Sequence, residues 1–219
     1  MKNFKHYKNT ILKKEKNMFK KIISFILLSS VFASFVYGQT AKSTLDGMAQ
    51  AYNGEMNASA AYAEFAKTTK NPSIAAMFKA ASSAEALHAK LLNDMALSSK
   101  LSAKALTATV NKPKPGADAD NLKSGIAGET YEYTKMYPAF SKVASNEKNK
   151  NVADLMNRTA AVEKTHAELY TKVMQDLSAN KTLPTVYYLC PVCGYIEAGS
   201  APNKCPLCNA TASSFQAFN

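Results

Sequence analysis

The chain has 219 residues, of which 47% are hydrophobic and 20% are charged, so it is long enough to bury one or two cores and too apolar to be disordered throughout. Its formal net charge of +11 would suit a nucleic-acid-binding protein, but residues 1–38 contain eight of the 27 basic residues and only one acidic residue. The other 19 basic and 15 acidic side chains form no basic run, so we expect no nucleic-acid partner.

Residues 1–38 have the form of a signal peptide. Two lysines precede an apolar run over residues 22–37, and a cleavage point lies before Gln39. The run is shorter than the roughly 20 residues that a membrane-spanning helix needs, although an uncleaved anchor is the alternative. Met18 could serve as the true start, because the residues before it add nothing that a signal peptide needs. The sequence therefore predicts an exported protein, located in the periplasm.

Four stretches after this leader place apolar residues at the spacing of one helix face. They cover residues 45–66, 74–95, 122–143 and 152–177. Asn71-Pro72 separates the first stretch from the second, and the polar residues 145–150 separate the third from the fourth. Because both breaks are short, each pair should form an antiparallel hairpin.

A long segment joins the two hairpins, from about Ser98 to Asn121, and contains a Lys-Pro-Lys-Pro-Gly run. A connection of this length is unusual in a compact domain unless it crosses the length of a bundle. The sequence thus predicts a mainly α protein with a ferritin-like four-helix bundle over residues 39–178. A linker at 179–184 and a small domain at 185–219 follow, and the latter is too short to build a core without a metal or another staple.

Charged residues interrupt each apolar stripe near its middle. The seven residues are Glu55, Glu85, His88, Glu129, Glu132, Glu163 and His166. Each histidine follows a glutamate by three residues, so each Glu-x-x-His pair can aim two ligands at one point. Any one of these residues alone would be an ordinary surface glutamate or core histidine. Five carboxylates on inward stripes without Lys or Arg need cations, however, and this is the di-iron or di-manganese carboxylate pattern.

These motifs closely resemble those of the rubrerythrin family. The matching stretches are Gly54-Glu55, Glu85-Ala86-Leu87-His88, Gly128-Glu129 through Glu132 to Met136-Tyr137-Pro138, and Glu163-Lys164-Thr165-His166. The resemblance implies that all seven residues bind two irons. It also implies that Glu132 exceeds the usual ferritin-like ligand set, and that one iron moves between Glu132 and His88 as the oxidation state changes.

The same resemblance suggests roles for two tyrosines. Tyr62 and Tyr137 match tyrosines that lie behind the ligands in the family, so they are the candidate catalytic residues. Ordinary core aromatics with a polar tip are the alternative interpretation. Pro138 removes one helical hydrogen bond and should bend the third helix just beyond the site.

The small C-terminal domain holds two Cys-x-x-Cys loops, formed by Cys190, Cys193, Cys205 and Cys208. Four thiolates in such loops bind one tetrahedral iron or zinc, whereas two disulfides are the alternative in an exported protein. The loops resemble those of rubredoxin, which favours a single iron. The residue after the second cysteine of each loop, Gly194 or Asn209, then needs a left-handed conformation.

The resemblance implies a peroxidase that reduces hydrogen peroxide to water in oxidative-stress defence. The cysteine iron would pass electrons from an external donor protein into the di-iron site of a partner subunit, since family members are commonly dimers. We therefore expect a homodimer or a higher homo-oligomer. The main rival is a ferroxidase or iron-handling protein built on the same bundle. A zinc-stapled binding module without turnover is a third reading, which the complete ligand set argues against.

Overall fold

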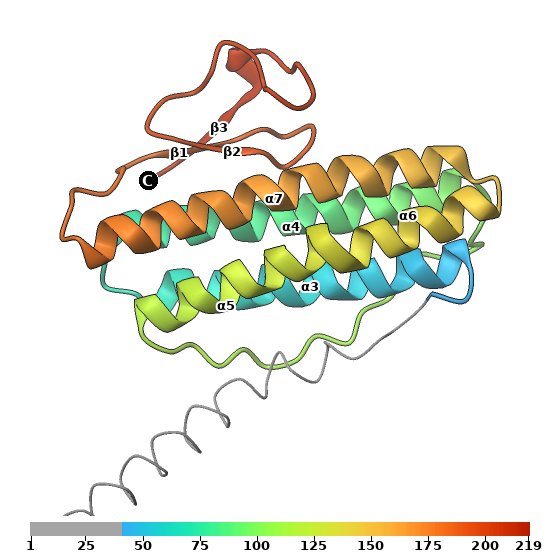
Figure 1. Ribbon diagram of the computed structural model, residues 1–219, viewed down its shortest axis with the longest axis horizontal. Helices are drawn as coiled ribbons and strands as arrows, with labels where there is room; N and C mark the ends of the chain where they lie inside the picture. Colours follow the sequence, from blue (N-terminus) through green and yellow to red (C-terminus); the bar gives the residue numbers. More distant parts are fainter. Residues whose placement is uncertain (1–40) are drawn as a thin grey trace, which may run out of the picture. The chain divides into compact units, whose positions relative to one another are not determined.

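Long helical rods and a small sheet make up residues 41–219, the part of the chain that the computed structural model describes (Figure 1). The signal peptide predicted at residues 1–38 lies outside this part. No helix in residues 41–219 is long and apolar enough to cross a membrane.

The first hairpin consists of α3 (Thr44–Thr68) and α4 (Pro72–Ser98). The side chain of Asn71 starts α4 by accepting hydrogen bonds of 3.0 and 3.3 Å from two N–H groups of its first turn. Ser59 and Ser82 bond reciprocally across the hairpin, each hydroxyl donating to the other residue's carbonyl at 2.8 Å. These small residues allow the two helices to approach closely.

The second hairpin pairs an irregular rod with one long helix. Its elements are α5 (Asp118–Tyr131), the π-helix η1 (Glu132–Met136), α6 (Tyr137–Asn146) and α7 (Lys150–Ser178). In η1 the turn is widened, and the N–H of Tyr137 bonds to the carbonyl of Glu132. The sequence attributed a bend to Pro138, but the irregularity already begins at Glu132, so the predicted seventh ligand itself lies in the widened turn.

The crossover between the hairpins, residues 99–117, has no regular secondary structure and runs along α3. The side chains of two asparagines on α3 bond to the backbone of this loop, as a neighbouring β-strand would in a sheet. Asn53 accepts a 2.8 Å hydrogen bond from the N–H of Thr109, and Asn57 accepts one of 2.9 Å from the N–H of Asn111. Side-chain amides thus satisfy the backbone of a long loop. The predicted arrangement of two hairpins and a long crossover is confirmed.

Two apolar clusters fill the bundle on either side of its middle. The aromatic cluster includes Tyr62, Phe65, Phe78, Tyr170 and Tyr187. The methionine cluster includes Met48, Leu92, Met136, Phe140 and Met156. Along α3, α4 and α7, the charged residues that the sequence singled out lie between the two clusters. Apolar packing at both ends therefore encloses a polar band.

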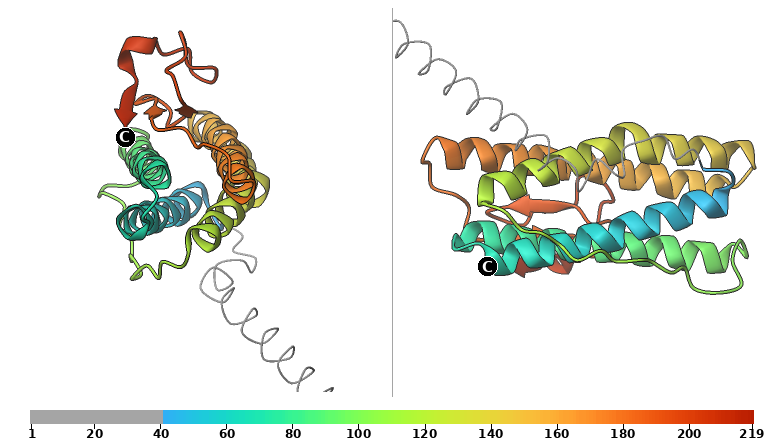
Figure 2. Two further views of the ribbon diagram at one scale, coloured as in Figure 1. Left: turned by 90° about the vertical axis from the view of Figure 1, so that its left-hand side faces the viewer. Right: turned by 90° about the horizontal axis from the view of Figure 1, so that it is seen from below.

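The cysteine domain is a three-stranded antiparallel sheet with the strand order β2-β1-β3. The strands are β1 (Tyr187–Leu189), β2 (Ile196–Ala198) and β3 (Gln216–Phe218), with a 3-10 turn η2 (Ala212–Ser214) before β3. The domain lies over α4 and α7 (Figure 2). Fully buried Tyr187 joins the aromatic cluster, and its hydroxyl lies 3.2 Å from that of Ser73. Apolar packing thus fixes the cysteine loops above the middle of the bundle.

Candidate functional site

A band of buried charge crosses the middle of the bundle. It contains all seven residues singled out in the sequence: Glu55 on α3, Glu85 and His88 on α4, Glu129 on α5, Glu132 on η1, Glu163 and His166 on α7. None of them is more than 9% exposed. Side chains more than 100 residues apart in sequence therefore meet in one interior region.

Six of the seven residues form two overlapping groups of candidate metal donors. One group is Glu55, Glu85, His88 and Glu163, and the other is Glu85, Glu129, Glu163 and His166. Within each group the donor atoms lie within 4.8 Å of one another. Because Glu85 and Glu163 belong to both groups, these two carboxylates would contribute to the binding of both of two neighbouring metal ions.

The hydrogen bonding of this band tests whether metal ions fit. Four glutamates have buried oxygens without a hydrogen-bond partner, including both oxygens of Glu163. Its Oε1 and Oε2 lie 2.7 and 2.9 Å from Nδ1 of His88 and of His166, respectively, but without the alignment of a hydrogen bond. Within residues 41–219, only one side-chain hydrogen bond joins two of the donor residues, between Nδ1 of His88 and Oε2 of Glu85 at 3.1 Å. Buried donor atoms that converge closely and mostly lack partners are arranged for cations, so the residues fit two metal ions.

Two tyrosines fix one oxygen each of two of these carboxylates. The hydroxyl of Tyr62 donates to Oε1 of Glu129 at 2.5 Å, and that of Tyr137 donates to Oε1 of Glu55. In both glutamates Oε2 is the oxygen left without a partner. Each tyrosine thereby orients a carboxylate so that its second oxygen is free for a metal ion.

Glu132 lies beside the two donor groups rather than within them. A Cβ placed on Gly54 would lie 3.9 Å from Oε1 of Glu132, which is an ordinary van der Waals distance. The backbone of Gly54 therefore lies next to this carboxylate without crowding it. The carboxylate of Glu132 makes no hydrogen bond or ion pair in residues 41–219, and the residue sits in the widened turn of η1. Its carboxylate is therefore the least constrained of the five.

The outward nitrogens of both histidines bond to the cysteine domain. Nε2 of His88 lies 3.0 Å from the carbonyl oxygen of Cys193, and Nε2 of His166 lies 2.9 Å from that of Gly194. A carbonyl only accepts, so each Nε2 carries a proton, and in the neutral imidazole Nδ1 is then the nitrogen that can bind a metal ion. The cysteine domain thus fixes the tautomer of both imidazoles.

Gly194 is required at this contact for two reasons. Its φ of +89° lies in the left-handed region, and a Cβ there would stand 2.3 Å from Nε2 of His88. The sequence explained Gly194 by loop geometry alone, but close approach to His88 excludes a side chain as well. Asn209, at the matching position of the second loop, has a φ of +64° as expected.

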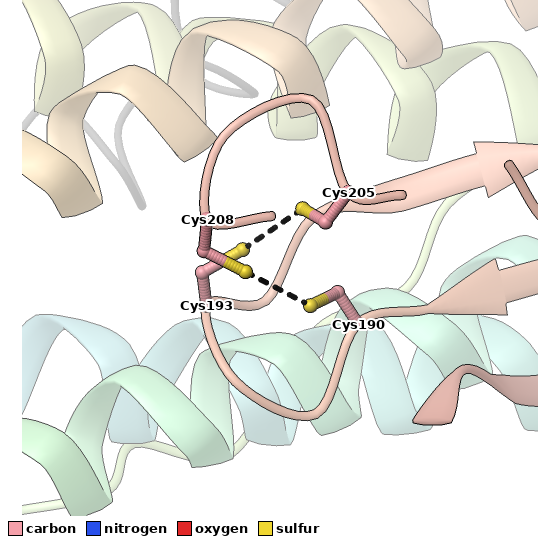
Figure 3. A group of neighbouring side chains, drawn as sticks. All are labelled: Cys190, Cys193, Cys205 and Cys208. Carbon is pink, nitrogen blue, oxygen red and sulfur yellow. Dashed lines mark hydrogen bonds between the residues drawn. The ribbon is translucent and has the colours of Figure 1, made fainter. Parts of the chain in front are cut away.

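The four cysteines face one another across the two loops (Figure 3). The sulfur atoms of Cys190 and Cys208 are 3.5 Å apart and those of Cys193 and Cys205 are 3.6 Å apart, so neither pair is a disulfide. Burial raises the pKa of the Cys190 thiol to about 11 and that of Cys193 even further. Thiols held together in this way bind a metal ion with loss of their protons, and the four sulfurs fit one tetrahedral ion.

Comparisons with known proteins decide the family. Residues 46–174 match the family model described as rubrerythrin, and residues 188–216 match the model described as the rubrerythrin rubredoxin-like domain. The chain belongs to the rubrerythrin family. It is 35% identical to nigerythrin from Nitratidesulfovibrio vulgaris over 179 residues, which cover 80% of this chain and 87% of that protein. It is 31% identical to rubrerythrin-2 from Clostridium acetobutylicum, over 80% of this chain and 96% of that one.

Solved structures agree with this assignment. The partially reduced state of nigerythrin matches the structure with a TM-score of 0.75 and 33% identity, covering 84% of this chain and 90% of that one. The predicted ferritin-like bundle with a rubredoxin-like domain is therefore confirmed. Rubrerythrins carry a di-iron site in the bundle and one iron in the rubredoxin-like domain, and both donor sets of this chain fit these cofactors.

Protonation of the rubrerythrin-type site opposes metal binding. Burial, followed by the charge of Glu163, raises the pKa of Glu55 to about 8. Burial and neighbouring carboxylates also raise the pKa values of Glu129 and Glu132. Burial alone would lower the pKa of His166, but the adjacent carboxylates outweigh it and raise this pKa to about 10. Near neutral pH, the metal-free site therefore holds protons where metal ions should bind.

Ferrous iron binding to the bundle is expected to release protons and to strengthen as the pH rises. At pH 7 at least one proton should leave Glu55 and one His166, because both pKa values lie above 7. Anaerobic calorimetry in buffers of different ionisation enthalpy measures this release directly. Affinity that does not change between pH 6 and about 8.5 would contradict the protonated resting site.

The rubredoxin-like domain contacts the bundle of its own chain. The bonds from His88 and His166 to the cysteine loop form within one chain. The sequence placed the electron relay in the site of a partner subunit, and that relay stays a prediction. Contacts between segments so far apart follow no sequence period, so the sequence did not indicate these two bonds. Dimerisation stays a prediction.

Proposed function

We propose that this chain is a peroxidase that reduces hydrogen peroxide to water in oxidative-stress defence, with electrons supplied one at a time through the rubredoxin-like domain. The reaction consumes one peroxide, two electrons and two protons and yields two water molecules. When bound, the two irons supply the redox chemistry and the Lewis acidity of the bundle site. The protein positions the donors, excludes bulk water and connects the two centres.

One observation carries this proposal: the hydrogen bond between the Cys193 carbonyl and Nε2 of His88. From the Cys193 sulfur to Nδ1 of His88, the path consists of covalent bonds and this one contact of 3.0 Å. His166 and Gly194 form a parallel contact. A ferroxidase or iron-storage protein would have no use for such a path, so the contact favours an electron relay over the iron-handling alternative.

The buried side chains have separate tasks in the proposed reaction. Glu85 and Glu163 belong to both candidate donor groups, so they would help to hold both metal ions. Tyr62 and Tyr137 keep Glu129 and Glu55 oriented through their Oε1 atoms. The aromatic and methionine clusters keep bulk water from the site, which strengthens every electrostatic interaction within it.

Mixing the anaerobically reduced, iron-loaded protein with peroxide or with oxygen tests the proposal. We expect peroxide to oxidise the di-iron site much faster than oxygen does, and a rubredoxin-type donor to sustain turnover. Faster oxidation by oxygen, together with accumulation of ferric iron beyond the bound ions, would instead identify a ferroxidase.

Glu132→Ala should leave both irons bound but slow peroxide reduction. The six other residues already make up the two donor groups, and Glu132 lies beside them. Loss of this least constrained carboxylate should therefore affect the reacting state more than the resting site. Iron analysis and stopped-flow oxidation by peroxide measure the two effects, and a parental rate would exclude a role for Glu132 in the reaction.

We also propose that the protein acts outside the cytoplasm, after removal of residues 1–38. The motivating observation is the lysine-flanked apolar run of the leader. The intact mass of the protein isolated from its native cells should correspond to a chain that begins near Gln39. A soluble cytoplasmic protein that retains Met1 or Met18 would rule out export.

A further inference from the structure

Tyr170 is a buried tyrosine whose hydroxyl has no hydrogen-bond partner within residues 41–219. Its side chain is 0% exposed and belongs to the aromatic cluster. A phenylalanine would fill the same space, whereas a hydroxyl buried without a partner destabilises the fold. Such a group calls for a partner that is not part of the chain.

The ring of Tyr170 points toward the metal site. Tyr170 follows His166 by four residues on α7, and helical side chains lean toward the N-terminus of their helix. The two rings accordingly stack, with centroids 6.2 Å apart and planes at 20°. The hydroxyl is thereby carried along the inner face of the bundle rather than toward solvent.

A glycine brings Tyr170 next to one of the two tyrosines already described. The rings of Tyr62 and Tyr170 meet edge to face, with centroids 5.8 Å apart. A Cβ on Gly125 would stand 3.0 Å from Cδ2 of Tyr170 and 3.5 Å from the hydroxyl of Tyr62. The missing side chain at Gly125 therefore lets both tyrosines pack beside Glu129, to which Tyr62 donates.

The hydroxyl of Tyr170 is a hydrogen-bond donor. An ordinary tyrosine hydroxyl loses its proton only near about pH 10. The phenol therefore retains its proton. Because Tyr170 is fully buried among packed side chains, a partner for its hydroxyl has to be a small species, about the size of water or peroxide.

We propose that Tyr170 is a third tyrosine of the di-iron site, whose hydroxyl donates a hydrogen bond to a small oxygen ligand held on the Glu129 side. The ligand is water in the resting protein and peroxide during reduction. The identification of the ligand as peroxide rests on the proposed peroxidase function, whereas the hydrogen bond from Tyr170 does not.

Azide binding to the oxidised, iron-loaded protein tests this donor without turnover. Azide is a small anion that accepts hydrogen bonds, and its binding is followed by the change in visible absorption. We expect Tyr170→Phe to weaken azide binding by about tenfold to a hundredfold, the range for one hydrogen bond to a charged acceptor. Tyr187→Phe is the matched control. It removes a hydroxyl from the same aromatic cluster, but the Tyr187 hydroxyl bonds to Ser73.

A crystal structure of the iron-loaded protein gives a second, independent readout. An ordered water within hydrogen-bond distance of the Tyr170 hydroxyl is expected in azide-free crystals, and an azide atom in its place after soaking. Unchanged azide affinity in Tyr170→Phe, or a Tyr170 hydroxyl with only carbon neighbours, would overturn the proposal. In the latter case Tyr170→Phe should raise the unfolding temperature, as expected for an ordinary core tyrosine. If Tyr170→Phe weakens azide binding but keeps the parental KM for peroxide, the Tyr170 hydroxyl donates to water alone. The assignment of peroxide as its ligand would then be wrong.

Discussion

Cys193→Ser is expected to reduce steady-state peroxide turnover with a rubredoxin-type donor to near background. Cys193 supplies one of the four converging sulfurs, and its carbonyl bonds to His88, so the change removes the iron carrier at the point of contact. The bundle should stay folded, because its two apolar clusters contain few residues from the cysteine domain. Turnover is measured as donor oxidation after addition of peroxide.

A single-turnover experiment separates the relay from the chemistry. If the bundle is reduced chemically, the Cys193→Ser protein should still consume peroxide once, since the candidate di-iron residues are unchanged. Gly194→Ala is a useful companion, because it keeps all four thiolates but forces its Cβ against Nε2 of His88. That protein should keep its ferric tetrathiolate colour and lose electron transfer. Zinc in the cysteine site together with unchanged turnover would contradict the relay and favour iron handling.

Glu163→Gln is expected to abolish metal binding in the bundle while leaving the cysteine iron in place. Glu163 belongs to both donor groups, and each of its two oxygens is close to one histidine. Glutamine keeps the volume but removes the charge and one acceptor oxygen. Iron affinity should fall by more than about a hundredfold, since removing even a residue that only orients a ligand costs about 10- to 100-fold.

Glu168→Gln is the matched control for this change. It removes the same charge from the same helix, but Glu168 is exposed and pairs only with Lys164 in residues 41–219, at 3.7 Å. Elemental analysis should find two irons fewer per chain in Glu163→Gln than in Glu168→Gln. The rise in unfolding temperature that the bundle irons cause should disappear in Glu163→Gln alone. Two bundle irons retained in Glu163→Gln would show that this carboxylate does not bridge the pair.

Local spacing made much of the fold and site predictable from the sequence. A Glu-x-x-His pair on an apolar stripe places two donors on one helix face, whatever the rest of the chain does. The short breaks at Asn71-Pro72 and at residues 145–150 predicted antiparallel hairpins. The two Cys-x-x-Cys loops predicted a shared metal ion, because each loop supplies only two of its four ligands. These features depend on residues that are a few positions apart, so the local sequence pattern is enough to predict them.

The features that were not predictable depend on approach between distant segments. No periodicity connects His88 with Cys193, although a glycine after Cys193 was a signal that something comes close. The widened turn at Glu132 was hidden because one extra residue in a helical turn barely changes the apolar pattern. Tyr170 looked like any core aromatic, since its lack of a hydrogen-bond partner appears only when its neighbours are in place.

The bonds from His88 and His166 to the cysteine loop also link the filling of the two metal centres. A metal ion in the cysteine site holds the loop that orients both imidazoles, so it favours iron uptake by the bundle. By thermodynamic reciprocity, the bundle irons must favour metal retention by the cysteines to the same extent. Coupling of this sign favours fully loaded and empty chains over half-loaded ones. When iron is scarce, the protein population would then contain a few complete molecules rather than many with a single working centre.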